Sequence, residues 1–333
     1  MKREAKDVKV LLSRQFPERG IKILRQEGYG VTVWDKDRPM TQKELIENSR
    51  SHTALFCTLS EKIDKVFLDE CSHLDIISQF GVGYDNIDIY QATRRGIPVG
   101  NTPGVLSDAT ADVAFGLMIS VSRKMGYLHK SILRGDWNYF RPNANLGIEL
   151  KNKILGLFGL GRIGLEMAKR CRGAYNMEII YHNRSRNSEA ERETGAKYVS
   201  FNDLVQSSDV LSVHTSLNQE TTGRFDKKVF DMMKPSAIFI NTARGQIHNE
   251  EDLIHALDNG IIWGAGLDVT NPEPMLPSNR LLSMENVMVL PHIGSATVET
   301  RNKMAELAAL NIKEFYRGKD IPNLVNPEVL KTG

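Results

Sequence analysis

The most informative feature of this chain is the segment Gly159-Leu160-Gly161-Arg162-Ile163-Gly164. An apolar run at 154–158, typical of a buried strand, precedes it, and a stretch with helical spacing follows it. A GxGxxG pattern between a strand and a helix indicates a dinucleotide-binding turn. Its first glycine allows the tight turn, the second lets the backbone approach a pyrophosphate, and the third lets the helix pack close to the strand. The N–H groups at the start of the helix then favour phosphates. The segment therefore predicts a site for a nicotinamide cofactor.

The bulk composition limits the possible partners and compartments. The 333 residues suffice for two ordinary domains, and 43 Lys and Arg against 41 Asp and Glu leave a net charge of +2. Such a balance does not favour a nucleic-acid or membrane partner. The three cysteines lack metal-ligand spacing, so we expect no metal site and free thiols. A polar N-terminus and the lack of a long apolar run predict a cytoplasmic protein.

Short apolar runs alternate with helix-like segments in both parts of the chain. The first series predicts strands at 8–12, 31–34, 54–57, 76–78 and 97–99. One long helix is predicted over 108–133, and a last helix over 297–317. The second series predicts strands at 154–158, 178–181, 210–214, 237–241, 264–269 and 287–290. This alternation favours an α/β fold with two parallel sheets, and the second series is long enough for a doubly wound sheet. The pattern alone does not assign the last helix to either sheet.

The end of the second strand in the second series bears on the choice of cofactor. A NAD-preferring unit carries Asp or Glu about 20 residues past the glycines, at the ribose 2′-OH. Here the corresponding segment is Asn183-Arg184-Ser185-Arg186, without a carboxylate. Guanidinium groups suit a 2′-phosphate, which a carboxylate would repel. The segment predicts that NADPH is preferred and NADH is weaker, although a solvated turn with two arginines is the alternative.

Three charged side chains follow the last strands of the second series. Arg244 follows strand 237–241, Glu273 follows strand 264–269, and His292 follows strand 287–290. Open α/β sheets bind ligands at these strand ends. Reduction of a 2-oxo acid needs a cation for the carboxylate and carbonyl, an acid for the forming alkoxide, and a carboxylate that keeps this acid charged. Arg244, His292 and Glu273 fit these tasks in that order, although each alone is more often structural or simply exposed.

These motifs, in this order, resemble the D-isomer-specific 2-hydroxyacid dehydrogenases over about residues 8–325. The resemblance is carried by 81–88, 159–164, 241–245, 266–269 with 272–274, and 291–297. The 183–186 segment is similar to NADPH-preferring glyoxylate/hydroxypyruvate reductases and 2-ketogluconate reductases. The resemblance implies an NAD(P)-dependent enzyme that reduces glyoxylate, hydroxypyruvate or 2-ketogluconate to the D-2-hydroxy acid. It does not fix which of these 2-oxo acids is physiological.

The resemblance also implies a domain organisation and a homodimer. Two doubly wound parallel-sheet domains are expected, with a Rossmann coenzyme domain at 104–295 inserted in a flavodoxin-like substrate domain at 1–103 and 296–333. The stretch 108–140 carries more apolar side chains than one helix face buries, and Trp137, Tyr139 and Phe140 lie on its last part. We expect these aromatics at a two-fold interface, with packing inside one chain as the alternative.

The resemblance implies roles residue by residue. Arg244 would bind the substrate carboxylate and keto oxygen, and His292 would be the general acid, paired with Glu273. The expected substrate-binding set adds the backbone N–H groups of Val82 and Gly83 to Arg244 and His292. The expected cofactor-binding set is Thr110, Gly159, Gly161, Arg162, Ile163, Gly164, Asn183, Arg184, Ser185, Arg186, Ser216, Thr242 and Asp268, the last at the nicotinamide carboxamide.

Two other functions stay open at this point. A NAD-dependent dehydrogenase such as phosphoglycerate dehydrogenase shares the motifs, but the missing ribose carboxylate disfavours it. A dinucleotide-sensing transcriptional corepressor also keeps these residues, but such proteins usually carry long flanking extensions, which are not seen here. Because fold does not fix function, the distinction requires a turnover assay.

Overall fold

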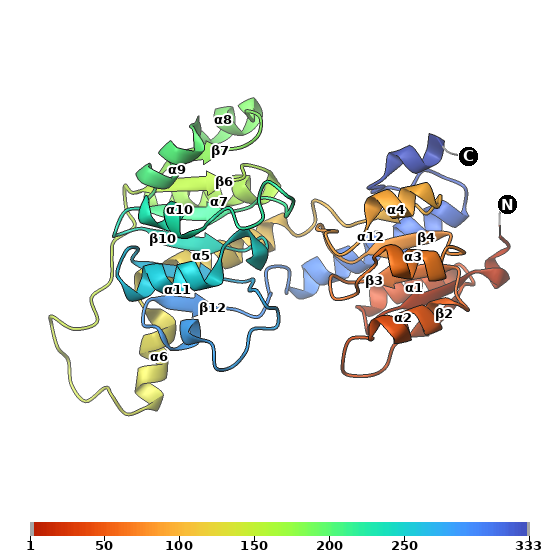
Figure 1. The fold of residues 1–333 in the computed structure, drawn as a ribbon, viewed down its shortest axis with the longest axis horizontal. Helices are drawn as coiled ribbons and strands as arrows, with labels where there is room; N and C mark the ends of the chain where they lie inside the picture. Colours follow the sequence, from red (N-terminus) through yellow and green to blue (C-terminus); the bar gives the residue numbers. More distant parts are fainter. Residues whose placement is uncertain (1–2, 332–333) are drawn as a thin grey trace. The chain divides into compact units, whose positions relative to one another are not determined.

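The computed structural model describes residues 3–331 and divides them into two compact units. The first unit runs to Leu106 and resumes at Ala296, and the second is Ser107–Ser295. Each unit is built around one parallel sheet with helices packed on it (Figure 1). The predicted fold class, α/β with two parallel sheets, is confirmed.

The first unit has a five-stranded sheet in the order β2-β1-β3-β4-β5, which is the flavodoxin-like order. Its strands are β1 (Lys9–Leu12), β2 (Gly30–Val33), β3 (Ala54–Cys57), β4 (Ile76–Gln79) and β5 (Val99–Gly100). Its helices are α1 (Glu18–Gln26), α2 (Gln42–Ser49), α3 (Lys65–Glu70), α4 (Ile89–Arg94) and α12 (Val298–Tyr316), with short 3₁₀ turns at Ala5–Asp7 and Pro327–Lys331.

The last helix, α12, belongs to this first unit. It packs so tightly on α1 that a Cβ at Gly20 would lie 2.6 Å from the carbonyl oxygen of Ala305. The Ser78 hydroxyl on β4 also donates to the carbonyl of Ala308, at 2.8 Å. The chain therefore returns to its first sheet after completing the second unit.

The second unit has a seven-stranded sheet in the order β12-β11-β10-β9-β6-β7-β8. Its strands are β6 (Ile154–Phe158), β7 (Glu178–His182), β8 (Lys197–Tyr198), β9 (Val210–Val213), β10 (Ile238–Asn241), β11 (Gly264–Leu267) and β12 (Val287–Val289). The strand order reverses between β6 and β9, and open α/β sheets bind ligands at such a switch point. Buried apolar clusters lie on both faces, so helices cover this sheet from both sides.

The helices of the second unit differ from the prediction at one important place. They are α5 (Ser107–Ser122), α6 (Met125–Leu133), α7 (Arg162–Tyr175), α8 (Ser188–Thr194), α9 (Phe201–Ser207), α10 (Lys227–Asp231) and α11 (Glu250–Asp258), with 3₁₀ turns at Gly245–Ile247 and Arg280–Ser283. The single helix predicted over 108–133 is wrong. The carbonyl of Ser122 accepts a hydrogen bond from the N–H of Ile148, at 2.9 Å, and Lys124 adopts a left-handed φ of 54°. This contact from a distant segment ends α5.

The glycine turn between β6 and α7 has two glycines that packing requires. Gly159 has a φ of 107°, which L side chains rarely adopt, and a Cβ there would meet the carbonyl oxygen of His214 at 2.6 Å. A Cβ at Gly164 would lie 2.2 Å from the carbonyl oxygen of Gly159. These contacts explain the turn and the close approach of α7 to β6.

A pair of glycine substitutions within α7 tests this packing. Gly164→Ala should lower the free energy of unfolding by about 1–3 kcal/mol, because the added methyl collides with backbone. The control is Gly173→Ala on the same helix, where no described atom lies within 4 Å of the new Cβ. This control should raise stability by about 0.5–1 kcal/mol. Chemical denaturation measures both, and equal effects in the two variants would contradict the packing argument.

Candidate active site

Three loops at one edge of the second sheet carry the predicted catalytic residues. β10, β11 and β12 run parallel and in register, with Asn241 opposite Leu267 and Leu267 opposite Val289. Their carboxyl ends therefore lie side by side, and the loops that follow carry Arg244, Glu273 and His292.

His292 and Glu273 form a direct pair. Nδ1 of His292 lies 2.6 Å from Oε1 of Glu273, and the two side chains are 33% and 42% exposed, so solvent or a ligand can reach them. Burial alone would raise the pKa of Glu273, but the hydrogen bond and the charge of His292 outweigh it and lower the pKa below its ordinary value. The carboxylate is therefore suited to hold an imidazolium, and Nε2 of His292 is left for other contacts.

Asp268 holds the backbone of the loop that carries His292. Its carbonyl accepts from the N–H of His292 at 2.9 Å, and its carboxylate accepts from the N–H groups of Ile293 at 2.8 Å and Gly294 at 2.7 Å. His292 itself has a φ of 54°, a left-handed conformation that is costly for a residue with a Cβ. Burial raises the pKa of Asp268. The two N–H groups that donate to its carboxylate lower this pKa, but they offset only part of the rise. Three hydrogen bonds to one residue thus keep His292 in a strained conformation.

Arg244 lies close enough to this pair to influence it. Its positive charge contributes to lowering the pKa of Glu273. One of its guanidinium nitrogens donates to the carbonyl of Ala243 at 2.7 Å. The next residue, Gly245, is pressed against the other loop, since a Cβ there would lie 2.0 Å from the carbonyl oxygen of Thr270. The structure therefore brings the Arg244, Glu273 and His292 loops together in one unit.

The glycine turn offers a place for a pyrophosphate. Apart from its immediate neighbours in the chain, no described residue has an atom within 4 Å of where a Cβ of Gly161 would stand, so the protein's own packing does not require this glycine. Helix α7 starts at Arg162 with no side-chain cap, which leaves the first N–H groups, including that of Ile163, available to an anion. Thus the residues of the turn fit a dinucleotide phosphate.

The other predicted cofactor residues lie on the same edge of the second unit. A Cβ at Gly294 would contact Thr110 Oγ1 at 3.4 Å, which places Thr110 beside the Asp268 loop. Thr242 is buried, and its hydroxyl has no hydrogen-bond partner among residues 3–331. Ser216 is exposed, and its carbonyl accepts from the Thr221 hydroxyl at 2.8 Å.

The ribose segment separates into engaged and exposed residues. Asn183 Oδ1 accepts from the N–H of Leu160 at 2.7 Å, so this side chain fixes the glycine turn. Arg186 makes a two-pronged ion pair with Glu191, at 3.0 and 2.9 Å. Arg184 and Ser185 are exposed, and neither side chain has a hydrogen bond within the described chain. Arg184 is therefore the guanidinium most available for a phosphate.

Val82 and Gly83 lie in the first unit, in the loop after β4. Their carbonyls accept hydrogen bonds from the side chains of Asn101, at 2.9 Å, and Gln79, at 3.3 Å. Their N–H groups have no partner among residues 3–331. Sequence reasoning missed Gln79 and Asn101. The only signal was that each polar side chain stands at the end of an apolar strand.

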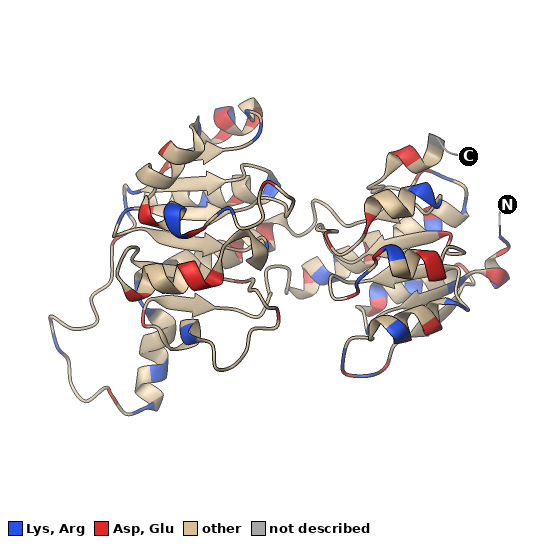
Figure 2. Ribbon diagram, viewed as in Figure 1, with Lys and Arg blue, Asp and Glu red and all other residues tan. Residues whose placement is uncertain are grey.

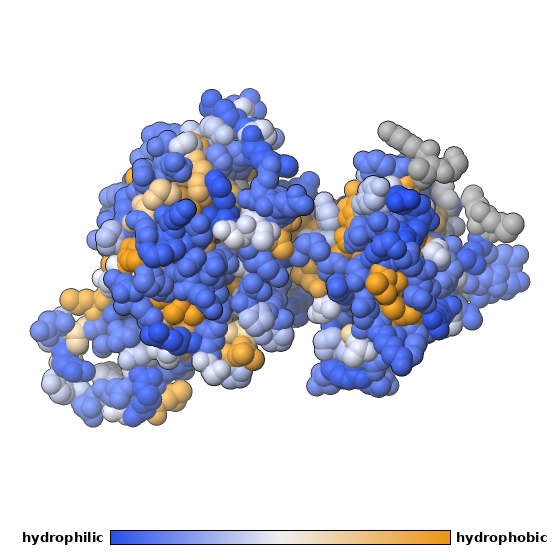
Figure 3. Space-filling view, viewed as in Figure 1, coloured by the Kyte–Doolittle hydropathy of each residue, from blue (hydrophilic) through white to orange (hydrophobic). Residues whose placement is uncertain are grey.

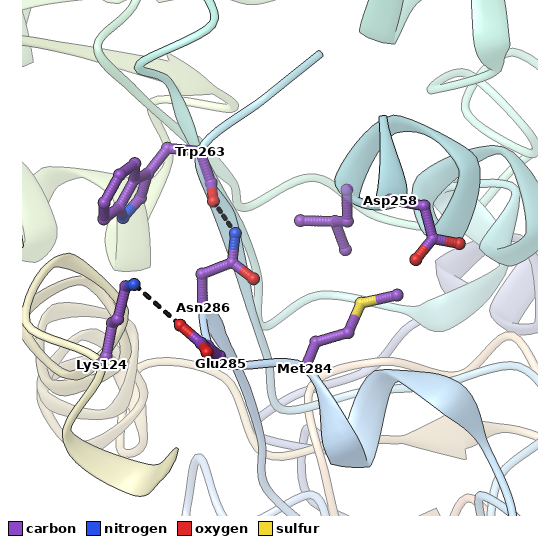
Figure 4. Close-up of a pocket in the computed structure, with 7 residues that line it drawn as sticks. Lys124, Asp258, Trp263, Met284, Glu285 and Asn286 are labelled. Atoms are coloured by element: carbon purple, nitrogen blue, oxygen red, sulfur yellow. Dashed lines mark hydrogen bonds and ion pairs between the residues drawn. The ribbon is translucent and has the colours of Figure 1, made fainter. Parts of the chain in front are cut away.

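The rest of the described surface is less informative. Figure 2 shows acidic and basic residues interspersed over the helices of both units. A pocket of about 280 Å³ lies at the amino ends of β11 and β12 (Figure 4). The loops that carry Arg244, Glu273 and His292 follow the carboxyl ends of the strands instead. The pocket's charges are already neutralised, since Lys124 pairs with Glu285 and Asp258 with Arg280.

Within residues 3–331, no helix has the length and apolar character to cross a membrane.

Comparison with known proteins identifies the family. Residues 115–294 match the NAD binding domain of the D-isomer specific 2-hydroxyacid dehydrogenases. A glyoxylate reductase of Thermococcus litoralis is 45% identical over 97% of this chain and 98% of its own length. This chain belongs to the D-isomer specific 2-hydroxyacid dehydrogenase family.

Solved structures of similar proteins extend over nearly the whole chain. An NADPH-dependent glyoxylate/hydroxypyruvate reductase from Sinorhizobium meliloti, in complex with NADP and malonate, has a TM-score of 0.84 and 31% identity, covering 97% of this chain and 98% of its own. A glyoxylate reductase from Paecilomyes thermophila has a TM-score of 0.82 and 32% identity, with coverages of 97% and 99%. The resemblance predicted from the sequence motifs is confirmed at the level of the family.

Proposed function

We propose that this protein reduces small 2-oxo acids such as glyoxylate or hydroxypyruvate to D-2-hydroxy acids, with NADPH preferred over NADH. The observation that carries the proposal is the Glu273–His292 pair, set beside Arg244 at the strand ends of a unit that matches an NAD binding domain. The named activity of similar proteins supports the substrate class. When bound, the nicotinamide cofactor supplies the hydride.

The chain's own residues would handle the carboxylate and the proton. Arg244 would bind the substrate carboxylate and polarise the carbonyl oxygen, which becomes an alkoxide. His292 would give that oxygen a proton from Nε2, because its Nδ1 is held by Glu273. The N–H groups of Val82 and Gly83 would bind the carboxylate from the first unit's loop, whose carbonyls are already held by other side chains.

The cofactor would lie along the strand ends of the second unit. The N-terminus of α7 and the open position at Gly161 would take the pyrophosphate. Thr110, Ser216, Thr242 and Asp268 would line the rest of the cofactor site. Arg184 and Ser185 would contact a 2′-phosphate, while Asn183 and Arg186 would act indirectly by fixing the neighbouring backbone and α8. The NADP complex of the similar Sinorhizobium meliloti reductase supports this choice of cofactor.

The cofactor assignment is tested by a pair of arginine substitutions. Wild-type protein should turn over glyoxylate with a kcat/KM at least about tenfold higher for NADPH than for NADH, or ~1.4 kcal/mol. Arg184→Ala should reduce the NADPH value much more than the NADH value. Arg186→Ala is the matched control, because Glu191 already engages that guanidinium, and it should show a smaller change. Equal losses with both cofactors in Arg184→Ala would argue against a phosphate contact, and the absence of any turnover would favour a non-catalytic binding protein.

The Glu273–His292 pair predicts the pH dependence of reduction. The reaction needs the imidazolium, so its rate should fall as pH rises, and the charged Glu273 should postpone this fall. In Glu273→Gln the alkaline limb of kcat against pH should therefore move to lower pH, because the neighbouring negative charge is lost. Steady-state rates of glyoxylate reduction across the pH range measure this, and a profile that keeps the wild-type position would rule out the pairing.

We also propose that the protein is a homodimer that uses the region of α6 and the segment after it. Trp137, Tyr139 and Phe140 are 72%, 69% and 84% exposed within the single chain, so they are not part of its own core. Figure 3 shows hydrophobic residues on this projecting loop. Exposed aromatic clusters of this kind mark interaction surfaces, and a self-complementary patch gives a closed pair.

The molar mass of the protein in solution tests whether it is a homodimer. Light scattering coupled to size exclusion should give the mass of two chains at micromolar concentration, and Phe140→Ser should shift the protein towards one chain. Tyr90→Ser, at an aromatic on α4 of the first unit that is 67% exposed, should leave the mass unchanged. A single-chain mass for the wild type would refute the proposal.

A further inference from the structure

The loop that carries Arg244 is supported from the interior by a buried amide–imidazole pair. The Asn241 side chain, at the end of β10, accepts from the N–H of Ala243 through Oδ1 at 2.9 Å and donates to the carbonyl of Arg244 through Nδ2 at 2.8 Å. The same Nδ2 lies 3.1 Å from Nδ1 of His248. Asn241 and His248 are both almost fully buried.

These contacts fix the protonation state of His248. Since one end of the Asn241 amide faces an N–H and the other faces a carbonyl, the backbone determines which end is the oxygen. The second hydrogen on Nδ2 then points to His248, so Nδ1 must be an unprotonated acceptor and Nε2 must carry the ring proton. Burial lowers the pKa of His248 to about 4, which agrees with a neutral ring at neutral pH.

Core packing alone does not account for His248. Its Nε2 is buried and has no hydrogen-bond partner within residues 3–331, which is unfavourable for a polar atom. Its ring packs edge-on against Phe239, with 5.7 Å between ring centroids, and the flanking Ile247 is fully buried. An aliphatic side chain would fill such a site without the cost of the unpartnered atom. The acceptor at Nδ1 is the feature that an aliphatic side chain cannot supply.

We propose that His248 is a positioning residue for Arg244. Its Nδ1 completes the hydrogen bonding of the Asn241 amide, and this amide fixes the backbone of the loop that carries Arg244. On the other side of the same loop, Gly245 is pressed against Thr270. The loop thus has two supports, and loss of the His248 contact weakens the one in which the Asn241 amide holds the Arg244 carbonyl. This inference rests on the proposed function of Arg244 in binding the substrate carboxylate.

Substitutions at His248 separate the effect of the hydrogen-bond acceptor at Nδ1 from the effect of the ring's volume. His248→Leu removes the acceptor, and His248→Asn retains one near the position of Nδ1. His248→Leu should raise the KM for glyoxylate and the inhibition constant of oxalate by about tenfold, the scale of one lost hydrogen bond, with a smaller change in the Kd for NADPH. His248→Asn should recover most of this loss. If His248→Leu does not fold, His248→Gln, which moves the acceptor away from Nδ1, should show the same loss.

A histidine in the first unit provides the control for a purely structural effect. His52 is also buried, and its Nδ1 lies 2.6 Å from the carbonyl of Asn48. His52→Leu should lower thermal stability without changing the KM for glyoxylate or the inhibition by oxalate. This contrast separates loss of stability from loss of loop position.

Hydrogen exchange measured by mass spectrometry tests the positioning without any need for turnover. Residues 241–249 should exchange faster in His248→Leu than in wild type, but not in His248→Asn, and β4 should be unaffected in both. If wild-type protein reduces no 2-oxo acid, the proposed function fails while this exchange pattern still decides the role of His248. Two results would overturn the inference. One is that His248→Leu keeps both the wild-type exchange rate and the wild-type KM for glyoxylate. The other is that His248→Leu and His248→Asn raise the KM equally.

Discussion

The buried carboxylate of Asp268 is the constraint on which the geometry of the candidate active site depends. His292 has a left-handed backbone conformation that would be unfavourable in isolation, and the residues around it must supply the compensating free energy. Asp268 does this through its own carbonyl and both carboxylate oxygens, which together accept three N–H groups from the His292 loop. The imidazole is thereby directed to Glu273 by the backbone as well as by its own hydrogen bond.

The same principle applies to the neighbouring loop. Parallel strands in register bring the ends of β10 and β11 side by side, but this alone does not orient the side chains that follow. Gly245 allows the Arg244 loop to touch Thr270, three residues before Glu273. Asn241 then ties the backbone of its own loop together. The sheet therefore sets the coarse position of the site, and buried polar contacts within each loop set its fine geometry.

Much of the fold and of the site followed from local patterns in the sequence. Apolar strands, the glycine turn and charged residues after strand ends leave short-range signals, and these predicted both sheets and the trio of Arg244, Glu273 and His292. The break between α5 and α6 was missed because its cause, the contact of Ile148 with Ser122, comes from a distant segment. The two-residue strand β8 and the short helix α8 are too brief to show a period.

Side-chain pairings were also beyond the reach of the sequence. Asn183 and Arg186 suited a ribose phosphate by residue type, yet the structure engages them with Leu160 and Glu191. His248 gives no signal in a buried, mostly apolar stretch, because its role depends on the orientation of an amide seven residues earlier. Residue type therefore predicts which chemistry is available, while partners within the fold decide which side chains remain available for a ligand.

The stereochemistry of the product tests whether this site reduces 2-oxo acids with His292 as the proton donor. Hydroxypyruvate gives a chiral product, so one incubation with NADPH followed by chiral chromatography reports reduction and the face of hydride addition together. We expect D-glycerate as the single enantiomer from wild-type protein and almost none from His292→Ala. Formation of L-glycerate or of a racemic mixture, or undiminished product from His292→Ala, would contradict it.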